Sequence, residues 1–213
     1  SIILNKFMSN NKMIFKKIFS CNPMNSAIAH ARVNLIGEHT DYTGGYVMPS
    51  LLPYSTKITI AENKEDNNHC AYSDFFNEKI SFNNLTKSTS NDWLDFIKGC
   101  LLIFFKEKSN IRKTYFNFLI ESNIPIGRGI SSSSALCVAT LKALNEYFET
   151  NYDKKYIAIL AQKVERDYIG VSGGIMDQMV SSIGIQGKAF FLNCLSLKYE
   201  LFDIPKDWIF YLV

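Results

Sequence analysis

Long apolar runs are missing from this chain of 213 residues, since none approaches the about 18 residues that a membrane-spanning helix needs. The five cysteines are widely spaced and show neither a disulfide framework nor a zinc-binding pattern, which favours a reducing, cytosolic compartment. The 23 basic residues are scattered, without the basic stripe of a nucleic-acid-binding protein. These absences argue against a membrane protein, a secreted disulfide scaffold and a nucleic-acid partner.

The composition is that of an ordinary globular protein, with 47% hydrophobic and 20% charged residues. Residues 1–24 mix lysines with short apolar clusters and lack the cleaner apolar stretch and cleavage site of a signal peptide. We therefore expect a disordered or weakly helical leader over residues 1–24, followed by one domain over residues 25–213.

Hydrophobic periodicity predicts helices from Trp93 and over residues 131–148 and 154–168, and a short helix around Asp177. Strands are expected over residues 57–62, 115–120, 189–193 and 208–213, with loops over 63–68 and 83–91. Helices and strands mixed in this order indicate an α+β (mixed α/β) fold.

Residues 31–45 (ARVNLIGEHTDYTGG) hold the most informative polar cluster. Four polar side chains fall within ten positions, behind an apolar lead: Arg32, Glu38, His39 and Asp41. Donors and acceptors packed this closely suit a ligand with many hydroxyl groups. The alternative is a solvated loop whose charges point outward.

Residues 125–135 (PIGRGISSSSA) place two glycines directly before a predicted helix. A glycine loop that leads into a helix N-terminus is an anion-binding arrangement, because free backbone N–H groups and the helix dipole both favour negative charge. The spacing matches neither the Walker motif nor the dinucleotide-binding motif. A serine-rich cap on an ordinary helix is the alternative.

Residues 173–178 (GGIMDQ) place Asp177 near the start of a short helix. A helix N-terminus favours an ionised carboxylate, so Asp177 is available as a proton acceptor. The alternative is a plain capping or first-turn acid.

Together and in this order, the three segments resemble the galactokinases and their superfamily, the GHMP kinases, over about residues 28–194. The resemblance implies the GHMP-kinase fold, of which the chain holds the N-terminal lobe and largely lacks the C-terminal lobe. It also implies ATP and Mg²⁺ as cofactors and D-galactose as substrate, in a full-length form that is monomeric.

By the same resemblance, Asp177 takes the proton from the anomeric hydroxyl, and Arg32 holds that carboxylate ionised and stabilises the phosphoryl group in transfer. Glu38, His39, Thr40, Asp41 and Gly174 bind the sugar. The nucleotide contacts are Gly127, Arg128, Gly129, Ile130, Ser131, Ser132, Ser133 and Trp93. Most galactokinases carry a small residue at the position of Arg128, whose charge either assists phosphate binding or obstructs it. Trp93 has core packing as its alternative role.

The resemblance assigns the magnesium ion to Ser133, with Ser131 as the alternative, and to Glu165, which stands twelve positions before Asp177. Taken alone, Glu165 reads as a solvated helix charge. Two rival functions remain: a kinase for N-acetylgalactosamine or another sugar, and a non-catalytic galactose sensor. The unbroken serine run favours catalysis. Because the third glycine-rich motif is absent, we expect the chain alone to be inactive or weak.

Overall fold

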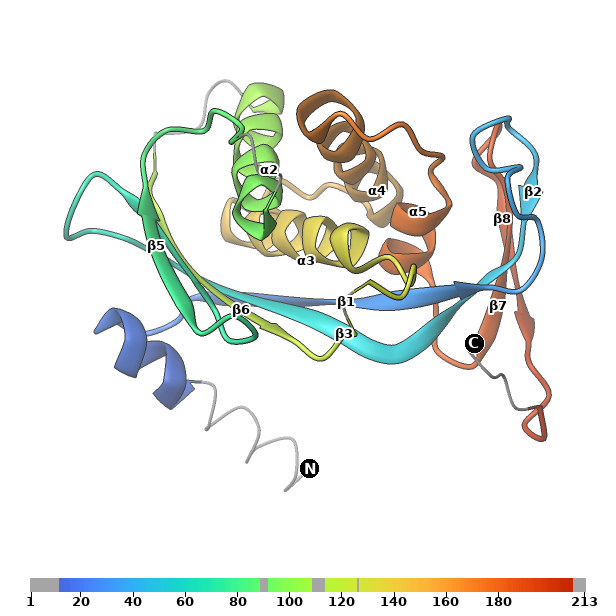
Figure 1. Cartoon of the computed structure of the whole chain (residues 1–213), viewed down its shortest axis with the longest axis horizontal. Coiled ribbons are helices and arrows are strands. Elements are labelled where there is room, and N and C mark those ends of the chain that lie inside the picture. The colour runs from blue at the N-terminus through green and yellow to red at the C-terminus, as the bar shows by residue number, and fades with distance from the viewer. Residues whose placement is uncertain (1–11, 89–91, 109–113, 126, 209–213) are drawn as a thin grey trace.

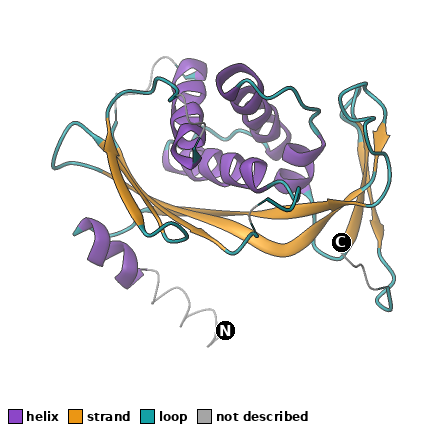
Figure 2. Ribbon diagram, in the orientation of Figure 1, coloured by secondary structure: helices purple, strands orange, loops and turns teal. Residues whose placement is uncertain are grey.

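The computed structural model describes residues 12–88, 92–108, 114–125 and 127–208. Figure 1 shows a curved sheet with the labelled helices gathered on one of its faces, and Figure 2 shows the same two layers by secondary structure. The elements are, in order, β1 (Asn25–Asn34), β2 (Tyr46–Val47), β3 (Pro49–Glu62), β4 (His69–Ser73), β5 (Glu78–Phe82), α2 (Trp93–Glu107), β6 (Phe116–Ser122), α3 (Ser132–Tyr147), α4 (Lys154–Lys163), the π-helical turn η1 (Val164–Ile169), α5 (Met176–Ile183), β7 (Lys188–Asn193) and β8 (Tyr199–Asp203).

The described strands form one eight-stranded sheet in the order β2-β7-β3-β6-β4-β5, with β1 added to β3 and β8 added to β7. Strands β4 and β6 run parallel, and the other paired strands run antiparallel. Helices on one side of such a sheet give the mixed α/β architecture that the sequence predicts.

Side-chain alternation along β6 divides the core between the two faces of the sheet. Phe116, Phe118 and Ile120 face the helices and join the main core cluster. Leu119 points to the opposite face, because successive side chains of a strand alternate. The face of the sheet away from the helices is therefore also apolar, and it would be exposed to water unless another segment packed against it.

A short helix over residues 12–19 packs against this face (Figure 1). Phe15 and Phe19 lie one turn apart on its inner side and are buried against Leu119 and its neighbours. Lys79 donates a hydrogen bond from Nζ to the Ile18 carbonyl oxygen at 2.8 Å. Of the two alternatives for the leader, disordered or weakly helical, the structure shows a helix over residues 12–19, because apolar groups at helical spacing meet an open apolar face. Residues 1–11 lie outside the described part of the chain.

We expect Phe15→Ala to lower the free energy of unfolding by about 3–5 kcal/mol, since it deletes a fully buried aromatic side chain and leaves a cavity. Met13→Ala on the same helix is the matched control, because Met13 is 63% exposed and its loss should stay within about 0.5 kcal/mol. Urea unfolding followed by tryptophan fluorescence measures both. Equal stabilities for the two variants would contradict the packing of this helix.

Other expected elements are found with shifted limits. The predicted strand over residues 57–62 begins earlier, at Pro49, and the predicted helix over 154–168 becomes α4 followed by η1. The sequence reading missed β1, β2, β4, β5 and β8. The strand expected over 208–213 lies almost wholly outside the described residues. Within the described part of the chain, no helix is both long and apolar enough to cross a membrane.

Candidate active site

Arg32 and Asp177 form the centre of the site. Arg32 is a residue of β1, and Asp177 lies in the first turn of α5, 145 positions later. The guanidinium group donates two hydrogen bonds to the carboxylate, from Nε to Oδ1 at 2.6 Å and from Nη2 to Oδ2 at 2.8 Å. Their side chains are 16% and 24% exposed, so the pair is accessible from one side. Bidentate geometry of this kind fixes the orientation of a carboxylate.

An irregularity in β1 joins Arg32 to the glycine loop. The register of β1 against β3 shifts between His30 and Arg32. The Arg32 backbone N–H donates to the Ile130 carbonyl oxygen at 3.2 Å, and its Nη1 donates to the Gly129 carbonyl oxygen at 2.8 Å. Bulges re-aim side chains at the edges of functional sites, and this one connects the strand to the end of the loop.

Ser131 stands between the loop and α3 in the left-handed backbone region, with φ 64° and ψ 46°. This conformation is uncommon for residues other than glycine and carries strain. Its hydroxyl makes no capping bond to α3 and instead donates to Asp177 Oδ2. The loop, the predicted base and Arg32 are therefore held together by side-chain contacts.

Glu165 lies in the π-helical turn η1, a type of turn that is frequent at functional sites. Ser134 Oγ lies 3.0 Å from Oε1 and 3.2 Å from Oε2, and Gln178 Nε2 donates to Oε2. Burial raises the pKa of Glu165, and the nearby Asp177 charge raises it further. Hydrogen bonds from Ser133, Ser134 and Gln178 oppose this rise.

The donors around Glu165 fit a magnesium ion. Among the described residues, no ion pair involves the partly buried Glu165 carboxylate, and its surroundings offer the hard oxygen atoms of Ser133 and Ser134. Magnesium prefers oxygen ligands and keeps several waters, so a few protein ligands suffice. The described residues contain no cluster of three or more His, Cys, Asp or Glu side chains that could hold a metal ion.

Gly174 approaches Asp41 more closely than any residue with a side chain could. A Cβ at position 174 would lie 2.2 Å from Asp41 Oδ2 and 2.4 Å from Asp41 Cγ. The segment that precedes α5 is therefore packed directly on the loop after β1. This contact brings together Asp41 and Gly174, both of which the resemblance assigns to sugar binding, and that assignment stays a prediction.

The other residues of the 31–45 segment have separate contacts. Asn34 Nδ2 donates to Glu38 Oε1 at 3.0 Å, and the Tyr42 hydroxyl lies 3.2 Å from His39 Nδ1. Thr40 Oγ1 lies 2.8 Å from the carbonyl oxygens of Gly37 and Tyr46. Thr40 thus closes the loop on itself, which is a structural role.

An apolar pocket of about 190 Å³ lies beside the start of α3. Its lining includes Phe75, Phe76, Trp93, Phe96, Ser132 and Ser133. Trp93 is near-parallel to Phe76, with ring centroids 6.4 Å apart, and donates from Nε1 to Glu78 Oε2 at 3.2 Å. Ser132 and Ser133, the first two residues of α3, line the same pocket as Trp93, so the pocket extends to the end of the glycine loop.

The loop itself is open. Gly127 and Gly129 have φ angles of 74° and 65°, and no atom lies within 4 Å of a Cβ built on either. Arg128 between them is exposed, whereas Ile130 is buried and joins the core. Among the described residues, nothing beyond the chain neighbours crowds the two glycines.

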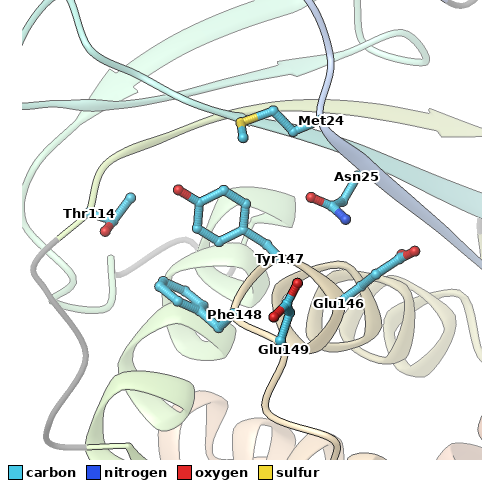
Figure 3. A pocket seen from close by; sticks show the side chains of 7 residues that line it. All are labelled: Met24, Asn25, Thr114, Glu146, Tyr147, Phe148 and Glu149. Atoms are coloured by element: carbon cyan, nitrogen blue, oxygen red, sulfur yellow. The ribbon is translucent and has the colours of Figure 1, made fainter.

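A second cleft, of about 550 Å³, lies at the opposite end of α3. Figure 3 shows Met24, Asn25, Thr114, Tyr147 and Phe148 around it with two glutamates. A helix of 16 residues is about 24 Å long, so this cleft is remote from the glycine loop. It has no part in the site.

Two family models match the chain. Residues 13–62 match the galactokinase galactose-binding signature, and residues 95–184 match the N-terminal domain of the GHMP kinases. The galactokinase of Pyrococcus furiosus is 41% identical over 178 residues, which are 83% of this chain and 49% of that protein. The chain belongs to the galactokinase family. It corresponds to the N-terminal portion, as the sequence motifs predict.

The galactokinase family match extends to structure. The galactokinase of Lactococcus lactis, solved in complex with galactose, superposes with a TM-score of 0.81 at 31% identity, over 93% of this chain and 52% of that one. The galactokinase of Staphylococcus carnosus is 34% identical over 97% of this chain and 53% of its own length. The chain thus spans about half the length of the galactokinases it matches. A mevalonate kinase at 20% identity and a TM-score of 0.69 shares the fold.

Sequence reasoning missed two contacts of Glu165. Ser134 hydrogen-bonds both oxygens of its carboxylate, beside the contact from Ser133, and the Ser131 hydroxyl donates to Asp177. Gln178 was not singled out, although it directly follows Asp177. The position of Gln178 directly after the candidate base Asp177 is the sequence feature that could have indicated this contact.

Proposed function

We propose that this chain carries the catalytic residues of a galactokinase, which transfers the γ-phosphoryl group of ATP to the anomeric hydroxyl of D-galactose. The observation that carries the proposal is the bidentate Arg32–Asp177 pair, tied through Gly129 and Ser131 to an open glycine loop. A base, a cation and an anion-binding loop are the groups that phosphoryl transfer requires.

In this reaction Asp177 accepts the proton of the anomeric hydroxyl while the oxygen of that hydroxyl attacks the γ-phosphorus. The bond from phosphorus to the β–γ bridging oxygen breaks, and ADP leaves. Arg32 fixes the orientation of the Asp177 carboxylate and offsets negative charge beside the transferred group. Ser131 holds Oδ2 from the other side until the sugar hydroxyl takes that place.

The loop and the apolar pocket accommodate the nucleotide. Gly127 and Gly129 leave the backbone accessible to phosphate oxygens, while the aromatic lining around Trp93 receives the base. Glu165, with Ser133 and Ser134, would hold the magnesium ion, which supplies charge neutralisation at the phosphates when bound. Asp41 and Gly174 face the sugar, and Glu38 and His39 extend its polar surroundings. The partners are two small molecules in the cytosol, and the full-length form acts as a monomer.

The test combines calorimetric binding with a coupled ADP-release assay on this chain, using galactose, N-acetylgalactosamine and glucose with and without Mg²⁺. We expect galactose to bind and glucose to be rejected, because a polar site discriminates against analogues that leave its groups unpaired. Galactose-dependent ADP release supports the kinase. Galactose binding without any ADP release, even at high enzyme concentration, is the result expected both of an N-terminal portion that is inactive alone and of a sensor. Preference for N-acetylgalactosamine would change the substrate. Failure to bind any sugar or ATP would contradict the proposal.

A further inference from the structure

We propose that Gln178 is a positioning residue, whose side-chain amide fixes the Glu165 carboxylate for a divalent cation and sets its place relative to Asp177. This inference rests on the proposed function. Gln178 lies in the first turn of α5, is 3% exposed, and donates from Nε2 to Glu165 Oε2. It directly follows Asp177, so the turn of α5 that carries the Asp177 carboxylate also contacts the Glu165 carboxylate.

The amide of Gln178 has Glu165 as its polar contact and nothing else in the described part of the chain. Its Oε1 atom is buried without a hydrogen-bond partner. Buried polar atoms are nearly always paired, and an unpaired acceptor destabilises the fold. If this side chain served packing alone, an apolar residue of the same shape would serve better. The contact with Glu165 is therefore the use that accounts for an amide here.

Without Gln178, the Glu165 carboxylate is held from α3 alone. Ser134 contacts both of its oxygens, and Ser133 adds a hydrogen bond from the same helix. Gln178 is the contact that ties Glu165 to α5, the helix that carries Asp177. The Glu165 and Asp177 carboxylates repel each other. The hydrogen bond from Gln178 restrains Glu165 and thereby keeps the distance between the two carboxylates fixed.

Gln178→Met tests this role, since methionine has a similar length and shape but cannot donate. ATP binding is titrated calorimetrically in EDTA and in MgCl₂, and Mn²⁺ binding is followed by electron paramagnetic resonance in the presence of ATP. We expect the cation-dependent gain in ATP affinity to fall by about tenfold or more, as for other groups that orient metal ligands. ATP affinity in EDTA should change by less than about twofold. The melting temperature should hold or rise, because the unpaired acceptor is removed.

Gln186→Met is the matched control, because Gln186 is exposed and lies away from Glu165. A folded Gln178→Met variant with an unchanged cation-dependent gain would overturn the inference while the proposed function stands. A wild-type chain with no cation-dependent gain would overturn the proposed function, and this inference with it. If Gln178→Met does not fold, ¹⁵N NMR of the wild type decides: the Gln178 side-chain amide must shift when Mg²⁺ is added to the ATP complex, more than that of Gln186. No such shift would overturn the inference.

Discussion

Asp177→Asn should reduce galactose-dependent ADP release by about a thousandfold, within the range that general-base catalysis contributes. The amide keeps the size of the carboxylate but cannot accept the proton of the attacking hydroxyl. It also loses one of the two charge-assisted bonds to Arg32, which now hold the group in place. Galactose affinity, measured by calorimetry, should change much less than turnover, because the proton moves only in the transition state.

Asp167→Asn is the control for this prediction. Asp167 is an exposed acid on η1 that pairs with the neighbouring Arg166 at 2.7 Å. Its replacement removes the same charge from the same region without touching the Arg32 contact, and turnover should stay within about twofold. Equal turnover in the two variants would show that Asp177 is not the base.

Gly174→Ala should weaken galactose binding by about a hundredfold or more. The new Cβ would lie 2.2 Å from Asp41 Oδ2 and 2.6 Å from the Asp41 backbone carbonyl carbon. No side-chain rotation relieves the second contact, so either the loop after β1 or the segment before α5 must move. Such a movement leaves polar groups that face the sugar unpaired, and a hydrogen-bonding site loses about two orders of magnitude or more of affinity when this happens.

Gly173→Ala provides a closely matched control for this steric prediction. It adds the same methyl group one residue earlier, where no atom lies within 4 Å of the new Cβ. Neither glycine has a positive φ angle, so backbone strain does not distinguish them. Calorimetric titration with galactose should find Gly173→Ala close to wild type. Similar losses in both variants would contradict the contact between Asp41 and Gly174.

The sequence predicts the chemistry of this site better than its geometry. Two of the three motifs contain Arg32 and Asp177. Glu165 lies in none of them and is indicated only by the family resemblance, since taken alone it reads as a solvated helix charge. The sequence reading did not find β1, the strand that carries Arg32, because Arg32 was read as part of a polar loop. The bulge that turns Arg32 toward Ile130 depends on pairing with β3, which no local pattern reveals.

The serine run shows a second limit. Successive residues of an α-helix differ by about 100° in direction, so an error of one residue in the helix start changes which hydroxyl meets Glu165. Ser131 adopts the left-handed conformation just before α3, and this sets Ser134 against the carboxylate. The contacts of Thr40 were hidden for a related reason, because the turn at Gly37 directs its hydroxyl to backbone carbonyl oxygens of the same loop.

The separation of 145 positions between Arg32 and Asp177 also determines when the site can form. Closing so long a segment of chain is entropically costly, and contacts between distant residues slow folding. During synthesis from the N-terminus, β1 and the glycine loop emerge well before α5, so a nascent chain has a phosphate loop and Arg32 but no base. The Arg32–Asp177 pair consequently reports complete folding.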